Sequence, residues 1–269
     1  MTDINVNIPG SNLSGVKNRI LVLSGKGGVG KSTVAVNLAA SLAEKGFRTG
    51  LMDVDIHGPS IPTMLGISGA AAVGSEEGIT PIESHGISVI SISFFVENID
   101  EAVIWRGPMK AGAIKQFVNE VNWGDLDYLV IDAPPGTGDE PLSVVQEIRD
   151  NIYAVIVTTP QVVAERDVRK SLNFCRKVNV PVAGIIENMS GFVCPHCNEI
   201  TNVFNTGAGI RLSDEFHVPF LGAIPIEPAI GKMCDEGTPW ITAMHDSTTA
   251  KVMNSAVDSI VDYIKENKK

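Results

Sequence analysis

The sequence has little of what marks several large classes of protein. Only 4 of its 269 residues are cysteine, too few for a scaffold held together by disulfides. No apolar run is long enough to span a bilayer, and the polar N-terminus MTDINVNIPGSNLSG has no apolar core of the kind found in signal peptides. We therefore expect a reduced, cytoplasmic protein that does not act in a membrane.

Basic residues are also scarce. The chain has 21 Lys and Arg against 31 Asp and Glu, which gives a formal net charge of −10. A broad nucleic-acid-binding surface needs clustered positive charge to displace counterions, so we expect no nucleic-acid partner. Hydrophobic residues make up 44% of the chain, and a chain of this length can bury a substantial core without disulfide or metal crosslinks.

Apolar runs alternate with longer amphipathic stretches from Arg19 onward. The apolar runs, many of them rich in β-branched residues, are 20–23, 49–52, 87–92, 128–131, 153–157, 182–186 and 220–224. The helix-length stretches between them include 32–45, 110–121, 141–149 and 162–178. Continuous apolar runs are typical of strands buried on both faces. Their alternation with helices predicts an α/β fold, in which a doubly wound, mostly parallel sheet is flanked by helices.

We expect one domain over residues 19–269, preceded by a flexible N-terminal tail at 1–18. Two insertions interrupt the pattern: 66–84, rich in Gly and Ala, and 191–206, which holds a close cysteine pair. The C-terminal segment 249–269 has an apolar stripe at helical spacing and a polar face of mixed charge. An anionic membrane would not favour that polar face, so we expect the helix to pack on the domain through Met253, Val257, Ile260 and Ile264.

The sequence GKGGVGKST follows the first apolar run and opens a helix-length segment. It matches the phosphate-binding pattern G-x-x-x-x-G-K-S/T, in which glycines let several backbone N–H groups face one anion at a helix N-terminus. Lys31 would reach the β- and γ-phosphates of ATP, and Ser32 would ligate Mg²⁺. The predicted nucleotide-binding residues of this loop are Gly25, Lys26, Gly27, Gly28, Val29, Gly30, Lys31, Ser32 and Thr33.

A dinucleotide-binding loop is the rival interpretation. The glycines at 25, 27 and 30 also fit G-x-G-x-x-G, and Asp53 follows where a ribose-binding acid would lie. A dinucleotide fold, however, has no use at that turn for a lysine followed by two hydroxyls. The run 31–33 therefore favours a nucleoside triphosphatase over a dehydrogenase.

Acidic residues follow two of the predicted strands. Asp132 ends an apolar run and fits the Walker B role of holding Mg²⁺, and Gly136 in the next loop could donate a backbone N–H to the γ-phosphate. Asp55 is the candidate for orienting the attacking water, because phosphoryl transfer depends mostly on positioning and charge. Asp53 is the alternative, with a possible place in the Mg²⁺ shell, and either acid could instead cap a turn. His57 is interpreted as a loop residue.

Cys194 and Cys197 have the spacing at which two thiolates bind one soft metal centre. One pair fills half of a four-thiolate site, and a symmetric dimer could supply the other half. A bridging iron–sulfur cluster, a zinc site and a redox disulfide all stay open. The disulfide is disfavoured because segment 191–201 looks like a hairpin, not the helix start of a thioredoxin unit. Cys175 and Cys234 are interpreted as small core or surface residues.

The pattern K-G-G-x-G-K-S/T resembles the deviant Walker A group of SIMIBI-type P-loop NTPases, which includes MinD, ParA and nitrogenase iron protein. In that group the early lysine, here Lys26, reaches across a dimer interface to the partner's nucleotide, in a role like that of an arginine finger. Together with the preceding arguments, this resemblance gives Lys26, Lys31 and Asp55 as the catalytic residues.

Nearly the whole chain resembles the Mrp/ApbC family of iron–sulfur cluster carrier ATPases. The matching segments are 25–33, 53–62, 105–109, 131–140 and 187–197. The resemblance implies a homodimer that holds a 4Fe–4S cluster between its two C-x-x-C pairs and transfers it to apo iron–sulfur proteins. It also implies that Asn188 contacts adenine. The alternatives are a MinD/ParA-like positioning ATPase and a zinc-bound, nucleotide-dependent regulator.

Overall fold

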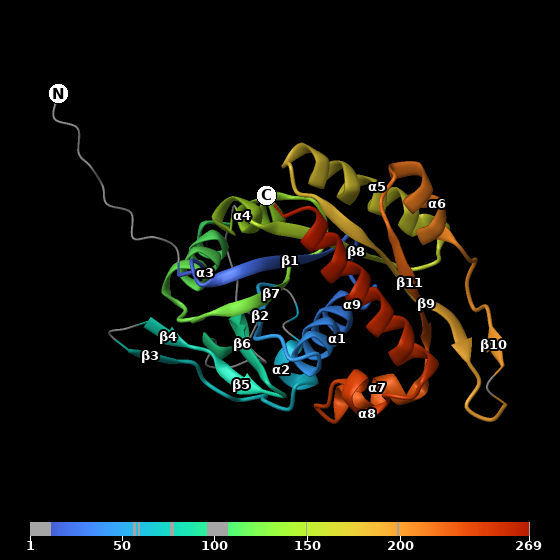
Figure 1. Cartoon of the computed structure of the whole chain (residues 1–269), viewed down its shortest axis with the longest axis horizontal. Coiled ribbons are helices and arrows are strands. Elements are labelled where there is room, and N and C mark those ends of the chain that lie inside the picture. The colour runs from blue at the N-terminus through green and yellow to red at the C-terminus, as the bar shows by residue number, and fades with distance from the viewer. Residues whose placement is uncertain are drawn as a thin grey trace.

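The computed structural model describes residues 12–55, 58, 60–75, 78–95, 107–148, 150–197 and 199–268. Within these residues, one sheet of nine strands forms the centre of the molecule (Figure 1). Its order is β10-β9-β8-β1-β7-β2-β6-β5, and β11 also pairs with β9. The strands are β1 (Val16–Ser24), β2 (Thr49–Asp53), β5 (Ile82–Ser84), β6 (Ile87–Ser91), β7 (Leu126–Asp132), β8 (Ile152–Thr158), β9 (Val182–Val193), β10 (Ile200–Thr201) and β11 (Phe220–Ile226).

The predicted mostly parallel sheet is confirmed. The pairings among β1, β2, β6, β7, β8, β9 and β11 are all parallel. Among the strands of the described residues, only β5 and β10 join the sheet antiparallel. Both faces of the sheet are covered by helices. In β1, Ile20 and Val22 pack in the hydrophobic cluster on one face, and Leu21 and Leu23 pack in the cluster on the other. This is why the strands are continuous apolar runs in the sequence.

Helices cover both faces, as a doubly wound fold requires. One cluster is completed by α1 and α9, which cross the same face of the sheet in Figure 1. The other is completed by α3, α4, α5 and α6. These helices are α1 (Lys31–Glu44), α3 (Gly107–Glu120), α4 (Asp139–Ile148), α5 (Val162–Lys177), α6 (Ala208–Phe216) and α9 (Thr248–Glu266). Shorter elements are α2 (Ile61–Met64), the 3-10 helix η1 (Ile92–Phe95), α7 (Pro228–Asp235), α8 (Trp240–Ala243) and the hairpin β3 (Val73–Ser75)–β4 (Gly78–Thr80).

The predicted packing of the C-terminal helix is confirmed. All four apolar residues of its stripe are buried against the α1 side of the sheet, and they are Met253, Val257, Ile260 and Ile264. Across the described part of the chain, we find no helix that combines the length and the apolar character needed to cross a membrane.

The first strand begins earlier than the sequence indicated. It starts at Val16, and Leu13 before it is fully buried. Lys17 and Asn18 are polar, but each has a partner in β7: Lys17 Nζ lies 2.7 Å from Asp127 Oδ1, and Asn18 Nδ2 donates to the Asp127 carbonyl oxygen at 2.9 Å. Part of the segment expected to be a tail is therefore bonded to the central sheet.

The expected hairpin around the cysteine pair is confirmed. β9 and β10 are antiparallel, with Val193 opposite Ile200. The Cys194 N–H donates to the Glu199 carbonyl oxygen at 3.0 Å and closes the turn. The cysteine pair therefore lies at the tip of an extension of β9, which is itself a strand of the central sheet.

Candidate nucleotide site and cysteine hairpin

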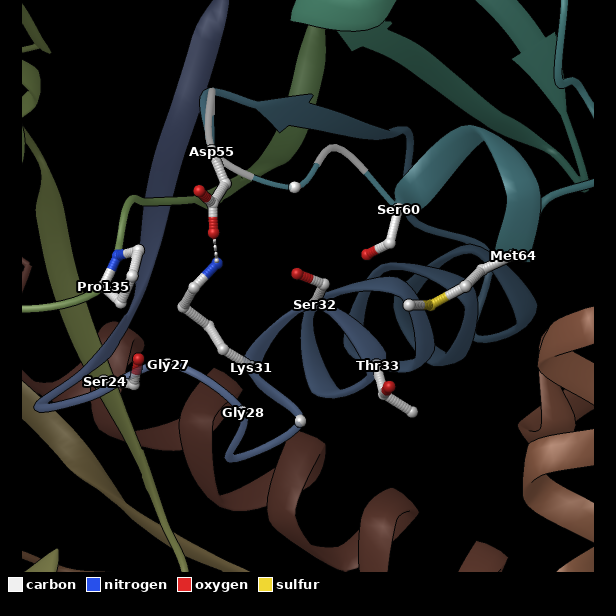
Figure 2. Close-up of a pocket in the computed structure, with 12 residues that line it drawn as sticks. Ser24, Gly27, Gly28, Lys31, Ser32, Thr33, Asp55, Ser60, Met64 and Pro135 are labelled. Atoms are coloured by element: carbon white, nitrogen blue, oxygen red, sulfur yellow. Dashed lines mark ion pairs between the residues drawn. The ribbon is translucent and has the colours of Figure 1, made fainter. Parts of the chain in front are cut away.

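The carboxyl ends of β1, β2 and β7 meet at one edge of the sheet. The parallel register places Asp132 between Val22 on one side and Asp53 on the other. At this edge a cavity of about 360 Å³ opens toward the loop between β1 and α1 (Figure 2). Its lining combines the glycine-rich loop with residues that follow β2 and β7, namely Ser24, Gly27, Gly28, Gly30, Lys31, Ser32, Thr33, Asp55, Gly58, Ser60, Met64 and Pro135.

Two glycines of the loop are required by its close contacts. Gly30 has a φ of 80°, and a Cβ there would lie 2.1 Å from Asn188 Nδ2. A Cβ on Gly25 would lie 2.4 Å from the backbone carbonyl carbon of Asp167 in α5. Neither position has room for a larger residue. The loop is therefore fixed against β9 on one side and α5 on the other.

Lys31 projects into the cavity and is bound by two acids. Its Nζ lies 2.5 Å from Asp132 Oδ1 and 3.3 Å from Asp55 Oδ2, and Figure 2 shows Lys31 and Asp55 pointing toward each other. Burial by itself lowers the pKa of Lys31, but Asp132 and Asp55 outweigh it and raise the pKa above its ordinary value. Lys31 therefore carries its positive charge at the position predicted to meet phosphate.

Ser32 and Asp132 together form an oxygen-rich corner of the site. Ser32 Oγ donates to Asp132 Oδ2 at 2.5 Å. Hydroxyl and carboxylate oxygens are the ligands that Mg²⁺ prefers in proteins. Burial raises the pKa of the Asp132 carboxyl, while Lys31 and Ser32 act in the opposite direction. The two side chains thus fit the Mg²⁺ roles predicted for them.

Asp53 differs from Asp55 although both follow β2. Asp53 is fully buried, and burial together with Asp132 raises its pKa to about 8. It accepts hydrogen bonds from Ser91 Oγ at 2.8 Å and from the Asp55 N–H at 3.1 Å. Asp53 is therefore buried and bonded within the fold, whereas Asp55 lines the cavity. His57 lies outside the described residues.

Lys26 is turned toward α5. Its Nζ donates to Gln161 Oε1 at 3.0 Å, and Gln161 directly precedes the first turn of that helix. Gln161 was not among the predicted site residues, since it belongs to no recognisable motif. Gly136 also has an unexpected partner, because its N–H donates to the Ser24 carbonyl oxygen at 2.8 Å. That bond would have to open before Gly136 could donate to a γ-phosphate.

A second cavity, of about 340 Å³, adjoins the first across Gly30 and Thr33. Asn188 lines it and donates from Nδ2 to the Val29 carbonyl oxygen at 2.9 Å. Most of the remaining lining is apolar and comes from β9, β11 and the elements that follow it, namely Met189, Ile224, Pro225, Ile226, Glu227, Pro228, Ile230, Gly231 and Trp240. Its apolar walls and its place beside the phosphate loop suit a flat nucleobase.

The two hairpin cysteines are accessible, with Cys194 half-buried and Cys197 exposed. The backbone N–H groups of His196 and Cys197 and the Cys197 thiol lower the pKa of Cys194, which favours the thiolate that metals bind. No group of three or more His, Cys, Asp or Glu that could hold a metal ion occurs within the described residues. A four-ligand centre at this pair would therefore need ligands beyond these residues.

The two other cysteines are not placed for binding a metal with this pair. Cys175 is fully buried in α5, and burial raises its pKa to about 12. Cys234 in α7 is half-buried and shares a hydrogen bond with the Thr33 hydroxyl. Cys175 is thus a core residue, which is one of the two positions expected for it.

The structure has the features that define a P-loop NTPase. A glycine-rich loop joins the central strand of a parallel sheet to α1, and a lysine and a serine are bonded to the acid that ends β7. Residues 15–261 match the ParA family model described as NUBPL iron-transfer P-loop NTPase, and the chain belongs to this family. It is also similar to a nucleotide-binding protein from Archaeoglobus fulgidus solved in complex with ADP. The identity is 41%, the TM-score is 0.74, and the match covers 84% of this chain and 88% of that one.

Curated relatives confirm the family resemblance seen in the sequence. The chain is 48% identical to the human cytosolic Fe-S cluster assembly factor NUBP2 over 256 residues, which are 93% of this chain and 94% of the relative. It is 48% identical to the yeast cytosolic Fe-S cluster assembly factor CFD1, with 87% and 83% covered. These names agree with the predicted cytoplasmic location. The Pyrococcus furiosus cell division ATPase MinD shares the fold, with a TM-score of 0.68 at 22% identity over 91% of this chain and 98% of that one.

Proposed function

We propose that this protein is an ATP-hydrolysing iron–sulfur cluster carrier, which holds a 4Fe–4S cluster between two copies of the chain and transfers it to apo iron–sulfur proteins. The observation that carries the proposal is the course of β9. Asn188 on this strand contacts the phosphate loop, and the strand leads directly into the turn that bears Cys194 and Cys197. The names of the relatives support the same function.

The nucleotide half of the proposal rests on the charged residues of the first cavity. Lys31 would bind the β- and γ-phosphates, and Ser32 and Asp132 would hold Mg²⁺, which neutralises phosphate charge when bound. Asp55 would orient the attacking water from the wall of the cavity. Asn188 and the second cavity would take the adenine, and Lys26 would act on the nucleotide of a partner subunit.

The cluster part of the proposal rests on the type of ligand that the hairpin offers and on the number of ligands that a cluster needs. Thiolates are the ligands of iron–sulfur clusters, and a 4Fe–4S cluster takes four. The hairpin supplies two, at an accessible tip with backbone N–H groups directed at the Cys194 sulfur. A homodimer with its two-fold axis at the hairpin would supply all four. Zinc could bind the same four thiolates, so metal identity must be part of any test.

The test is metal analysis of protein purified and reconstituted without oxygen. We expect about four iron and four sulfide per dimer for the wild type, and a large loss for Cys194→Ala and for Cys197→Ala. Cys175→Ala is the matched control, since that thiol is buried away from the hairpin. A cluster-loaded monomer, or full iron in Cys194→Ala, would contradict the bridging site. Zinc without sulfide would favour the regulator instead.

A further inference from the structure

We infer that Glu187 is a positioning residue for the cysteine pair, because it fixes β9 at the point where this strand leaves the central sheet. Glu187 was not among the predicted site residues, and it has no part in the proposed nucleotide or cluster chemistry. The inference rests on the proposed function, in that Cys194 and Cys197 are the proposed ligands of the cluster. The position of the hairpin itself can be measured without any cluster.

β9 loses one of its neighbouring strands at Glu187. Its pairing with β8 ends here, with Glu187 opposite Thr158. Farther along, β9 pairs with β11 and then with the short strand β10. The ladder with β11 is irregular, since the three residues 189–191 lie opposite the single residue Pro225. Met189 also has a φ of 58°, which is uncommon for a residue with a side chain. The backbone ladder alone therefore holds this part of β9 weakly.

The Glu187 carboxylate supplies contacts that the ladder lacks. The residue is 2% exposed, and each of its carboxylate oxygens accepts one hydrogen bond. Oε1 accepts from Ser190 Oγ at 2.7 Å, three residues along the same strand. Oε2 accepts from the Gly209 N–H at 2.7 Å, in the first turn of α6. One side chain thus braces the irregular part of β9 and joins the strand to a helix.

The N-terminus of α6 depends on this carboxylate. The first backbone N–H groups of a helix have no partner within it, and the side chain of the N-cap residue usually accepts from one of them. The N-cap of α6 is Gly207, which has no side chain to do so. Glu187 takes that role from the neighbouring strand, and the helix dipole favours its negative charge. The contact is close, because a Cβ on Gly209 would lie 3.2 Å from the Glu187 Cβ. β9 and α6 are therefore fixed to each other at this point.

The place of Glu187 in β9 connects it with the cysteines. The next residue, Asn188, reaches the phosphate loop on the opposite side of the strand. β9 is thus held from both sides shortly before the cysteine turn, which the Cys194 N–H closes by donating to the Glu199 carbonyl oxygen. Thiolates that share a cluster must be held in a fixed geometry. Without the Glu187 carboxylate, the hairpin would change its orientation and would hold its two thiolates less well where a cluster needs them.

The first test follows the hairpin in reduced, metal-free protein. Exchange of the Cys194 amide hydrogen, resolved by residue, measures how often the turn opens. At this amide, Glu187→Ala should exchange at least about tenfold faster than the wild type, because the Gly209 N–H loses its buried partner. Ser190→Ala loses one bond and should show a smaller increase. Glu187→Gln should stay near the wild type, since its amide can accept from Gly209 and donate to Ser190.

Glu215→Ala is the matched control. Glu215 is a carboxylate of the same helix, but it joins α6 to α5 through Arg169 at 2.8 Å on the surface. Wild-type amide exchange within β1 would show that the sheet of each variant is intact. If Glu187→Ala opens the turn no more than Glu215→Ala does, or if Glu187→Gln opens it as far as Glu187→Ala, the inference is wrong. Should Glu187→Ala fail to fold, an unchanged Cys194 amide in Ser190→Ala would also overturn it.

The second test measures iron in protein reconstituted without oxygen and then desalted. The wild type and Glu215→Ala should retain about four iron per dimer, and Glu187→Ala should lose most of it. If Glu187→Ala opens the turn and yet retains full iron, Glu187 does not position the cysteines for a cluster. If the wild type holds no cluster while Glu187→Ala opens the turn, the proposed function falls and the role of Glu187 in placing the cysteine turn stands.

Discussion

The side-chain amide of Asn188 donates a 2.9 Å hydrogen bond to the carbonyl oxygen of Val29, and so ties β9 to the phosphate loop. The same contact leaves no space for a side chain at Gly30. The position of the loop and the position of the strand that leads to the cysteine pair are therefore set by each other.

Replacing Asn188 by alanine should weaken ATP binding by about tenfold. The variant loses a buried hydrogen bond, which contributes on the order of 1 kcal/mol, and the amide proposed to contact adenine. Isothermal titration calorimetry measures the affinity. Asn254→Ala is the control, because Asn254 bonds Ser41 between α9 and α1, away from both cavities. Unchanged ATP affinity in Asn188→Ala would remove this residue from the site.

Lys31→Ala and Asp132→Ala should each lower Mg²⁺-dependent ATP hydrolysis by about a hundredfold or more. Each removes a charge proposed to act on the phosphates or on their metal. Phosphate release under saturating ATP is the measurement. Asp127→Asn serves as the control, since Asp127 lies on the same strand but pairs with Lys17 at the surface. Wild-type turnover in either site variant would refute the assignment of the loop.

Asp55→Ala should still bind ATP but should hydrolyse it slowly, because a residue that orients water acts mainly in the transition state. Single-turnover kinetics separates the two effects by following ATP that is already bound. If the variant instead binds poorly and converts bound ATP at the normal rate, Asp55 belongs to the metal shell.

Thiol alkylation at pH 8 should modify Cys194 and Cys197 and spare Cys175. Only the thiolate reacts, and burial raises the pKa of Cys175 to about 12, so that only about one part in ten thousand is ionised at pH 8. Peptide mapping by mass spectrometry gives the extent at each cysteine. In denaturant, all four cysteines should react alike. Fast labelling of Cys175 in the native protein would show that α5 opens readily.

The strands of the central sheet could be predicted from the sequence. Each buried strand is a local apolar run, which can be recognised without knowing which strands lie beside it. It failed at the start of β1. Lys17 and Asn18 look like loop residues, and they are accommodated in a strand only because Asp127, distant in sequence, accepts hydrogen bonds from both. No local pattern records a partner so far along the chain.

The same limit applies to the site. The positions of the phosphate loop and of Asp132 at the ends of neighbouring strands were predictable, because a fixed spacing in the sequence marks both. Gln161 and Ser91 were missed, since each acts through a contact between elements that meet only in the folded chain. A glutamine before a helix and a serine at the end of a strand are both ordinary, so a single sequence gives no sign that these two residues contact the site.

Under the proposed function, the length of β9 separates the nucleotide site from the cysteine pair within each subunit. Fully extended, at about 3.3 Å per residue, the chain from Asn188 to Cys194 would span at most roughly 20 Å, and the register shift between Asn188 and Phe192 shortens this distance. The proposed phosphate site and the cysteine pair are therefore separate, and under the proposed function hydrolysis would act on the cysteines through a displacement of the strand. Met189 and Gly191 interrupt the extended backbone between them, with φ of 58° and 87°. Under the proposed function, a movement of the loop would reach the hairpin through this irregular stretch of β9.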